Sequence, residues 1–251
     1  MKNRLYTINI SIILGLFSFC LSTNLMAAPN GNQIFYTSSD GKVVKPNRTI
    51  FFGANIISNE YKDGQGIITF DGDVTKIGDF AFDRCSSLTS IIIPNSVTTI
   101  GEGAFEYCSG LTSVTIPNSV TTIGEWAFDG CTSLTFITIP NSVITIEYGA
   151  FYTCSSLTSV TIGNSVTTIG NYAFYKCSGL TKTNYTGTIA GWCKINFDGS
   201  SSNPMSYSHN FYINDVEIKD LVIPEVVDTI SDYAFYTCSS LTSVTIGNSV
   251  T

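Results

Sequence analysis

Few residues of this chain could do chemistry, and most of them are cysteines. The sequence contains eight cysteines and a single histidine, His209. A thiol beside a histidine can act as a nucleophile, and Cys193 with His209 is the pair that the sequence offers. No third catalytic group accompanies the pair, and His209 lies in a polar stretch, residues 206–210. We therefore interpret His209 as an ordinary loop histidine.

Two carboxylates, Asp71 and Asp73, alternate at the end of an apolar stretch. Such a pair could bind calcium or assist the hydrolysis of a sugar bond. The same residues are typical of a solvated turn, which is the interpretation that we prefer. The glycines are spread through turns and form no phosphate-binding loop, and the cysteines lack the spacing of zinc ligands. We predict no catalytic residue, no metal site and no cofactor.

Six of the cysteines occupy the same place in a repeated phrase, Ala-Phe-x-x-Cys. Five copies follow one another at a step of 23 residues, and a sixth comes later; they begin at Ala81, Ala104, Ala127, Ala150, Ala173 and Ala234. A fixed period of this length indicates a solenoid, in which each coil buries its apolar side against the next coil. Solenoids usually bind partners along a long modular surface.

Each repeat predicts two short strands and one helical turn. In the copy that starts at Leu111, Val114 and Ile116 alternate with polar residues, as in a strand, and residues 117–119 form a turn. A second extended piece ends at Ile123, and residues 127–131 have helical spacing. Stacking places the cysteines in one ladder. Buried, reduced thiols are the favoured interpretation, and disulfides between neighbouring coils are the alternative.

The two ends of the chain differ in sequence from the repeats or interrupt them. Residues 1–27 resemble a signal peptide with a charged start, an apolar run and a cleavage site after Ala27. A membrane span or a lipid anchor on Cys20 is the alternative, although Phe19 before that cysteine disfavours the lipid. The chain stops at Thr251 within a coil, which suggests a fragment whose missing C-terminus carries further coils or an anchor.

The remaining chain divides into four parts. Residues 28–65 are predicted to form an N-terminal cap with a hairpin between 34–36 and 42–44. The 23-residue repeats follow over 66–185, and residues 66–70 align with the repeat strand. Residues 186–220 form an insertion or modified repeat with a hairpin between 211–213 and 216–218. Repeats resume over 221–251 and end there, apparently truncated.

The net charge of the chain restricts the classes of partner that it could bind. The net charge is −7, and removal of residues 1–27 takes away Lys2 and Arg4 and leaves −9. An acidic chain with few Lys and Arg is unsuited to nucleic acid or to an anionic membrane surface. No later segment is apolar enough to be an integral membrane segment.

Two surfaces are candidate binding sites. The strand face would present an array of hydroxyl groups with one aromatic residue: Thr112, Thr115, Phe136, Thr138 and Thr161. A solvated sheet face is the alternative, since Thr favours strands. The variable turn positions carry aromatic residues, which are frequent at binding hot spots: Phe80, Trp126, Tyr148, Tyr172 and Tyr233. Packing between neighbouring turns is the alternative there.

The repeat resembles the BspA-like, or Treponema-type, leucine-rich repeats. The string from Ile116 to Leu134, which reads Ile-Pro-Asn-Ser-Val-Thr-Thr-Ile-Gly-x-x-Ala-Phe-x-x-Cys-x-x-Leu, carries the resemblance. It covers residues 65–185 and 221–251. The resemblance implies a right-handed leucine-rich-repeat solenoid, secreted or on the cell surface, that acts in adhesion.

Three functions remain open at this point. The leading hypothesis is a non-enzymatic adhesion module that binds an extracellular protein, such as a matrix protein, through many weak contacts. A glycan-binding module, with Tyr and Trp as stacking platforms, is the second. A structural spacer that carries missing C-terminal domains is the third.

Overall fold

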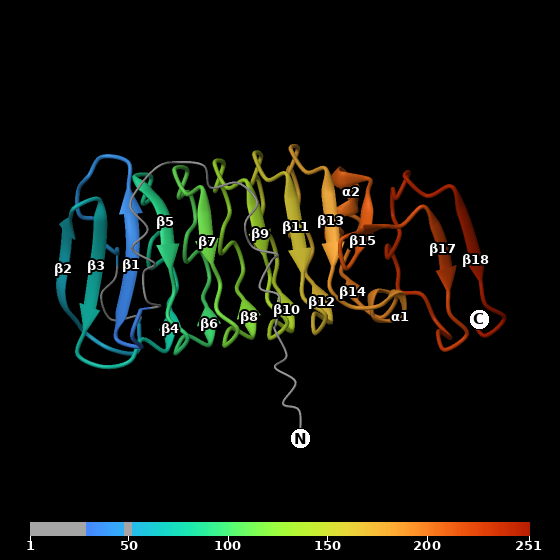
Figure 1. Ribbon diagram of the computed structural model, residues 1–251, viewed down its shortest axis with the longest axis horizontal. Helices are drawn as coiled ribbons and strands as arrows, with labels where there is room; N and C mark the ends of the chain where they lie inside the picture. The colour runs from blue at the N-terminus through green and yellow to red at the C-terminus, as the bar shows by residue number, and fades with distance from the viewer. Residues whose placement is uncertain (1–28, 48–51) are drawn as a thin grey trace, which may run out of the picture.

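The computed structural model describes residues 29–47 and 52–251. The predicted signal peptide and Cys20 lie outside these residues. The described chain winds into an elongated stack of coils, and its longer strands lie side by side along the long axis (Figure 1). The 23-residue period is therefore the step from one coil to the next.

One row of two-residue strands runs unbroken along the stack. Its members pair in parallel in the order β4 (Lys76–Ile77), β6 (Thr99–Ile100), β8 (Thr122–Ile123), β10 (Thr145–Ile146), β12 (Thr168–Ile169) and β14 (Asn196–Phe197). Thr122 pairs with Thr145, one sequence period later. Residues that pair in neighbouring strands are therefore one sequence period of 23 residues apart.

The second row carries the longer strands and is divided into sheets. The first sheet has the order β2 (Ile56–Lys62), β3 (Gln65–Phe70), β1 (Gln33–Ser38), β5 (Leu88–Ile92) and β7 (Ser113–Thr115). The second has the order β16 (Val216–Glu217), β15 (Phe211–Ile213), β13 (Lys182–Tyr185), β11 (Ser159–Ile162) and β9 (Phe136–Thr138). β17 (Asp220–Ile223) and β18 (Ser243–Ile246) pair separately.

The N-terminal segment differs from the predicted hairpin. β1 pairs antiparallel with β3 on one side and with β5 on the other, and residues 42–44 form no strand. β1 therefore stands between β3, whose residues 66–70 align in sequence with the repeat strand, and β5, the strand of the next repeat. The central position of β1 buries both Ile34 and Tyr36, which a two-stranded hairpin would leave partly exposed.

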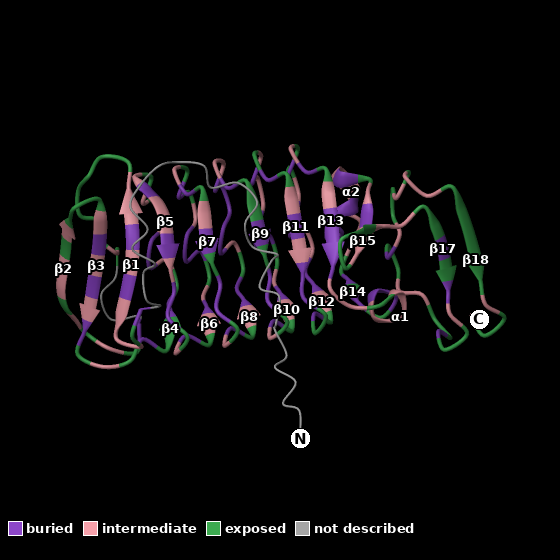
Figure 2. Cartoon of the chain, viewed as in Figure 1, coloured by how far each residue is buried: buried purple, intermediate pink, exposed green. Residues whose placement is uncertain are grey.

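A stack of phenylalanine rings forms the centre of the core. Successive rings lie 5.2–5.3 Å apart between centroids, with interplanar angles of 0–11°, in the series Phe82, Phe105, Phe128, Phe151 and Phe174. All five side chains are fully buried. Buried residues run through the stack from β1 to β15, whereas β18 is exposed throughout (Figure 2).

The six cysteines of the ladder are free thiols; four of them are buried, as expected, whereas Cys85 and Cys238 are only partly buried. The Sγ atoms of four cysteines lie 2.9–3.2 Å from the backbone carbonyl oxygen of the phenylalanine 26 residues earlier, to which they donate: Cys108, Cys131, Cys154 and Cys177. Burial raises the pKa of Cys177 to about 12 and also raises the pKa of the other three thiols. Since only the thiolate reacts, these groups are inert at neutral pH.

We expect this inertness to be measurable. In the native chain at pH 8, iodoacetamide should leave Cys131 and Cys154 unlabelled over a time in which the urea-unfolded chain is fully labelled, because the raised pKa and burial suppress both thiolate formation and access. Peptide mass spectrometry gives the extent at each cysteine. Equal labelling of Cys131 in the native and unfolded chains would contradict the buried ladder.

The segment predicted as a helical turn is a run of hydrogen-bonded turns. The amide of Ala127 donates to Gly124 and that of Cys131 to Phe128, at 3.3 and 3.2 Å. Trp126 and Gly130, however, have φ angles of 55° and 67°. These left-handed residues interrupt the right-handed conformation that a helix requires.

Residues 186–220 continue both rows of strands. β14 extends the short row, and β15 pairs in parallel with β13 in the long row. Two single-turn helices connect them, α1 (Ile189–Trp192) and α2 (Met205–Ser208). Trp192 is fully buried, and its Nε1 donates to the carbonyl of Ala234 at 2.7 Å. The expected hairpin is confirmed, because β15 pairs antiparallel with β16.

Candidate binding surfaces

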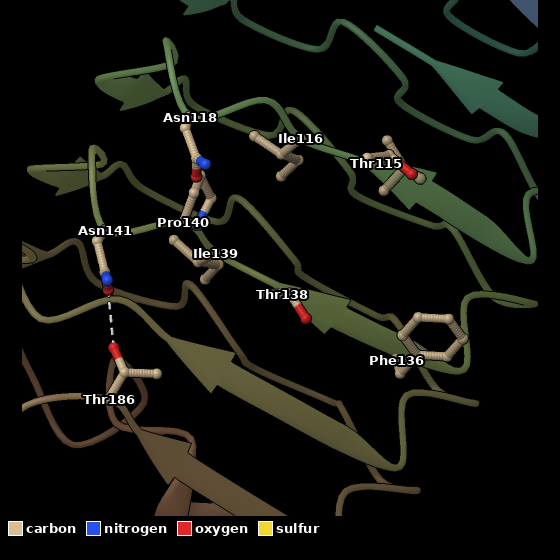
Figure 3. A pocket seen from close by; sticks show the side chains of 10 residues that line it. Thr115, Ile116, Asn118, Phe136, Thr138, Ile139, Pro140, Asn141 and Thr186 are labelled. Carbon is tan, nitrogen blue, oxygen red and sulfur yellow. Dashed lines mark hydrogen bonds between the residues drawn. The ribbon is translucent and has the colours of Figure 1, made fainter. Parts of the chain in front are cut away.

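A groove opens on the strand face between β7 and β9. It has a volume of about 380 Å³, and residues of both strands and of the turns that follow them line it. Figure 3 shows Thr115 and Ile116 on one side and Phe136, Thr138 and Ile139 on the other. We call it the strand-face groove.

The groove lies at a break in the backbone hydrogen bonding. β5 pairs with β7, and β9 pairs with β11, but β7 and β9 belong to different sheets. The amide of Thr112 donates to Thr89 at 2.9 Å and that of Thr158 to Thr135 at 2.8 Å. Within the described chain, the amide of Thr135 makes no corresponding bond to Thr112. The edges of two adjacent strands therefore face each other unpaired.

The two coils on either side of the groove stay joined elsewhere. β8 pairs with β10 in the short row, and the amide of Phe105 donates to Ala127 at 2.8 Å in the turn region. The stack is thus continuous along its other sides and opens on the strand face alone. The groove is therefore a cleft between two coils that remain hydrogen-bonded to each other.

The opening exposes part of the apolar core. Val114 and Ile116 are 8% and 7% exposed, whereas Ile137, the counterpart of Val114 in the next coil, is 1% exposed. Phe136 stands at the edge of the groove and is 49% exposed. Neighbouring coils have serine at its position: Ser90, Ser113 and Ser159. The groove therefore has an apolar floor and an aromatic edge.

Amide and hydroxyl side chains form the polar end of the groove. The Oδ1 atom of Asn141 accepts a hydrogen bond from the Thr186 hydroxyl at 2.8 Å, drawn in Figure 3, and another from the amide of Asn164 at 3.0 Å. Asn118 is exposed beside them. These groups would orient a polar segment of a bound partner.

The groove brings together three of the residues predicted on the strand face, Thr115, Phe136 and Thr138. Thr112 and Thr161 do not line it, and the Thr112 hydroxyl donates to the carbonyl of Thr89 at 2.9 Å. Sequence reasoning missed Asn141 and Thr186, which are 45 residues apart and meet only through the stacking of coils.

A second concave surface lies on the turns and is lined by aromatic rings alone. Its volume is about 330 Å³, and its residues are Trp126, Tyr148, Tyr152, Tyr172 and Tyr175. Neighbouring ring centroids are 4.9–5.5 Å apart, mostly edge to face. Edge-to-face contacts are a favoured arrangement of aromatic pairs, so the rings support one another. We call this surface the aromatic hollow.

Glycines in adjacent coils make room for these rings. A Cβ atom on Gly149 would lie 2.5 Å from the ring of Trp126, and one on Gly103 would lie 2.4 Å from the ring of Phe80. All four residues have positive φ angles of 54–61°. Large and small residues thus alternate along the stack, because each ring extends over the backbone of the next coil.

The hollow unites three of the predicted turn residues, Trp126, Tyr148 and Tyr172, with two further tyrosines. Phe80 and Tyr233 do not line it. Phe80 lies against Gly103, and Tyr233 packs edge to face against Tyr236 at 5.9 Å.

The residues considered for catalysis make structural contacts. The Nδ1 atom of His209 lies 3.1 Å from the carbonyl of Thr237, and Cys193 is buried with a pKa raised to about 11 by burial. Asp71 accepts hydrogen bonds from the amide and side chain of Asn55, both at 2.8 Å, which lower its pKa, as in a solvated turn. Over residues 29–47 and 52–251, no group of three or more His, Cys, Asp or Glu residues is placed to hold a metal ion.

Comparison with protein families identifies the repeat. A family model described as "BspA type Leucine rich repeat region (6 copies)" matches residues 64–203 and 205–251. The chain belongs to this family. Leucine-rich repeats of this kind form protein-interaction modules, and their solenoids typically serve as binding scaffolds. None of the curated proteins matches the chain.

Solved structures of bacterial leucine-rich-repeat proteins are similar to the chain. A leucine-rich cell surface protein from Faecalibacterium prausnitzii is 37% identical over 49% of this chain and 33% of its own length, with a TM-score of 0.48. The leucine-rich-repeat protein of T. pallidum is 28% identical over 72% and 66%, with a TM-score of 0.45. One from Bacteroides ovatus is 26% identical over 70% and 59%, with a TM-score of 0.43. The matches cover from a third to two thirds of these proteins.

Over residues 29–47 and 52–251, no helix has the length and apolar character needed to cross a membrane.

Proposed function

We propose that this protein is a secreted or cell-surface adhesion module that binds an extracellular protein through the strand-face groove. The observation that carries the proposal is the break between β7 and β9, which exposes an apolar floor beside Phe136. Aromatic residues, phenylalanine included, are enriched at the core of protein–protein interfaces, where a partner would cover Phe136 and the apolar floor. Membership of a family of interaction modules supports the same function.

The shape of the groove favours a protein partner. It is open along the strand face and bordered by exposed threonines, such as Thr115 and Thr138, so that a partner can extend beyond it over neighbouring coils. Repeated weak contacts over several coils would add avidity to the central contact. Export through a signal peptide at residues 1–27 and the absence of enzymatic activity are parts of the proposal.

Binding of the full chain to immobilised extracellular-matrix proteins, measured by biolayer interferometry, tests the proposal. Phe136→Ser installs the residue that other coils carry at this position and removes the aromatic edge. We expect saturable binding to at least one matrix protein and a loss of affinity of roughly tenfold or more in this variant, since removal of a hot-spot aromatic has effects of this size.

Ile144→Thr is the matched control. Ile144 is 49% exposed, like Phe136, and does not line the groove. Threonine occupies its position in other coils, for example Thr121 and Thr167. Equal affinity losses in the two variants, or unchanged binding in Phe136→Ser, would place the contact elsewhere. Binding to a glycan array without binding to any protein would show that the partner is a glycan and not a protein.

A further inference from the structure

The side chains on the turn surface that contains the aromatic hollow change from acidic to aromatic along the stack. Two positions of the repeat, two residues before Ala and one residue after Phe, carry carboxylates in the first three coils: Asp79, Asp83, Glu102, Glu106, Glu125 and Asp129. We call this row the acidic ridge. In the next two coils the same positions carry Tyr148, Tyr152, Asn171 and Tyr175. The ridge therefore leads directly into the hollow.

Two cationic side chains of the chain itself contact aromatic rings of this surface. The ammonium group of Lys176 lies 5.8 Å from the ring centroid of Tyr152 and 5.6 Å from that of Tyr175, both in the hollow. At the other end of the surface, the guanidinium of Arg84 lies 4.7 Å from the ring centroid of Tyr107. These distances are those of cation–π contacts. The rings thus offer faces to cations even within the monomer.

The charges beside the hollow are unbalanced. Two cations lie near this surface, Lys176 in the hollow and Arg84, which is 3.6 Å from Asp83. No Lys or Arg occurs between residues 85 and 175, a stretch that contains four of the six ridge carboxylates, of which Asp129 is buried. Burial and the neighbouring carboxylates of Asp83 and Asp129 raise the pKa of Glu106. This like-charge crowding would be relieved by a positive group from outside, and the field of the ridge would attract such a group toward the hollow.

We propose that the aromatic hollow, together with the acidic ridge beside it, binds a lysine- or arginine-rich segment of a partner protein. One cationic side chain enters the hollow and contacts the faces of Trp126 and the surrounding tyrosines. Further cations of the same segment lie along the exposed carboxylates Asp79, Glu102 and Glu125, which recur once per coil. The ridge repels anionic glycans, and its several charges suit a segment with several cations. This surface is distinct from the strand-face groove.

Titration of the full chain with synthetic ten-residue oligolysine and oligoarginine tests the proposal by calorimetry, with a Gly-Ser peptide of equal length as the uncharged probe. Trp126 also gives a fluorescence signal, since the only other tryptophan, Trp192, is fully buried. We expect saturable binding of the basic peptides, a change in Trp126 emission, and an affinity that falls with added salt.

The variants separate cation–π recognition from charge alone. Trp126→Gly and Tyr172→Gly remove rings at a position where Gly103 and Gly149 already stand with positive φ, so the backbone accepts the change. Together they should weaken basic-peptide binding about fivefold to tenfold. Glu102→Gln with Glu125→Gln should also weaken binding and reduce its salt dependence. Phe136→Ser should leave it unchanged, which distinguishes this surface from the groove.

Three results would overturn the proposal. The first is an absence of basic-peptide binding at low salt. The second is full retention of affinity in the Trp126→Gly, Tyr172→Gly double variant, because binding would then be charge attraction alone. The third is binding of a neutral oligosaccharide to the hollow in place of the basic peptides, which would assign the surface to glycans. Matching thermal midpoints of the variants and the parent chain establish that folding is intact.

Discussion

Phe128→Ala should lower the free energy of unfolding by about 3–5 kcal/mol, the usual cost of removing a buried aromatic ring. Phe128 is fully buried, and its ring stacks between those of Phe105 and Phe151 at 5.2 and 5.3 Å. Backbone hydrogen bonds hold the adjacent coils at a fixed distance, for example from the amide of Phe128 to Ala150 at 2.8 Å. The neighbours therefore cannot collapse into the cavity, and coupling between the two halves of the stack weakens.

Urea unfolding followed by circular dichroism measures this effect. Phe136→Ser is the control, because it removes the same type of side chain from an exposed position and should change stability by less than about 0.5 kcal/mol. A loss below about 1 kcal/mol for Phe128→Ala would mean that the phenylalanine ladder does not hold the coils together.

Gly66→Ala should destabilise the N-terminal sheet by about 1–3 kcal/mol, the range for an overpacked core. Gly66 of β3 lies directly opposite Tyr36 of β1, and a Cβ atom there would be 2.0–2.3 Å from three atoms of the tyrosine ring. That ring is held in place, because its hydroxyl donates to Asn59 at 2.8 Å and accepts from the amide of Val44 at 3.2 Å.

Gly72→Ala provides the comparison for this substitution. A Cβ atom on Gly72 would meet only Ala54, at 3.9 Å, which is an ordinary contact. Thermal unfolding of the two variants should therefore separate them, with a lower midpoint for Gly66→Ala alone. If both variants unfold at the parent temperature, Tyr36 does not pack across Gly66, and the placement of β1 between β3 and β5 is wrong.

The repeating core could be predicted from the sequence because it depends on period alone. Once equivalent residues recur every 23 positions, Phe105 and Phe128 must fall on neighbouring coils, and so must Cys108 and Cys131. The hairpin at residues 211–217 was predictable for a local reason, since Asn214 and Asp215 readily adopt the positive φ angles of 49° and 65° found there.

The features that could not be predicted depend on contacts distant in sequence. The alternation of Ile34 and Tyr36 indicates a strand but does not say which strands flank it. Gly66, which accommodates the tyrosine ring, becomes informative only once the pairing is known. The left-handed turns do have a signal in the sequence, because Gly103 and Gly149 alternate with aromatic residues at one position, and glycine tolerates positive φ.

Only part of each candidate surface could be predicted from the sequence. Phe136 and the turn aromatics stood out because they depart from an otherwise regular repeat. The break between β7 and β9 could not be seen, since the residues of both strands follow the ordinary pattern of the repeat apart from Phe136. Whether two backbones pair depends on the distance between coils, which no single residue encodes.

The structural feature behind the proposed function is the open strand-face groove, and amide hydrogen exchange measured by NMR on the full chain tests it most directly. The amide of Thr135 should exchange at least tenfold faster than that of Thr158, because Thr158 donates to Thr135 at 2.8 Å while Thr135 has no counterpart bond within the described chain. Binding of a matrix protein should then protect Thr135. Equal protection of Thr135 and Thr158 in the free chain would contradict the open groove and the binding site placed in it.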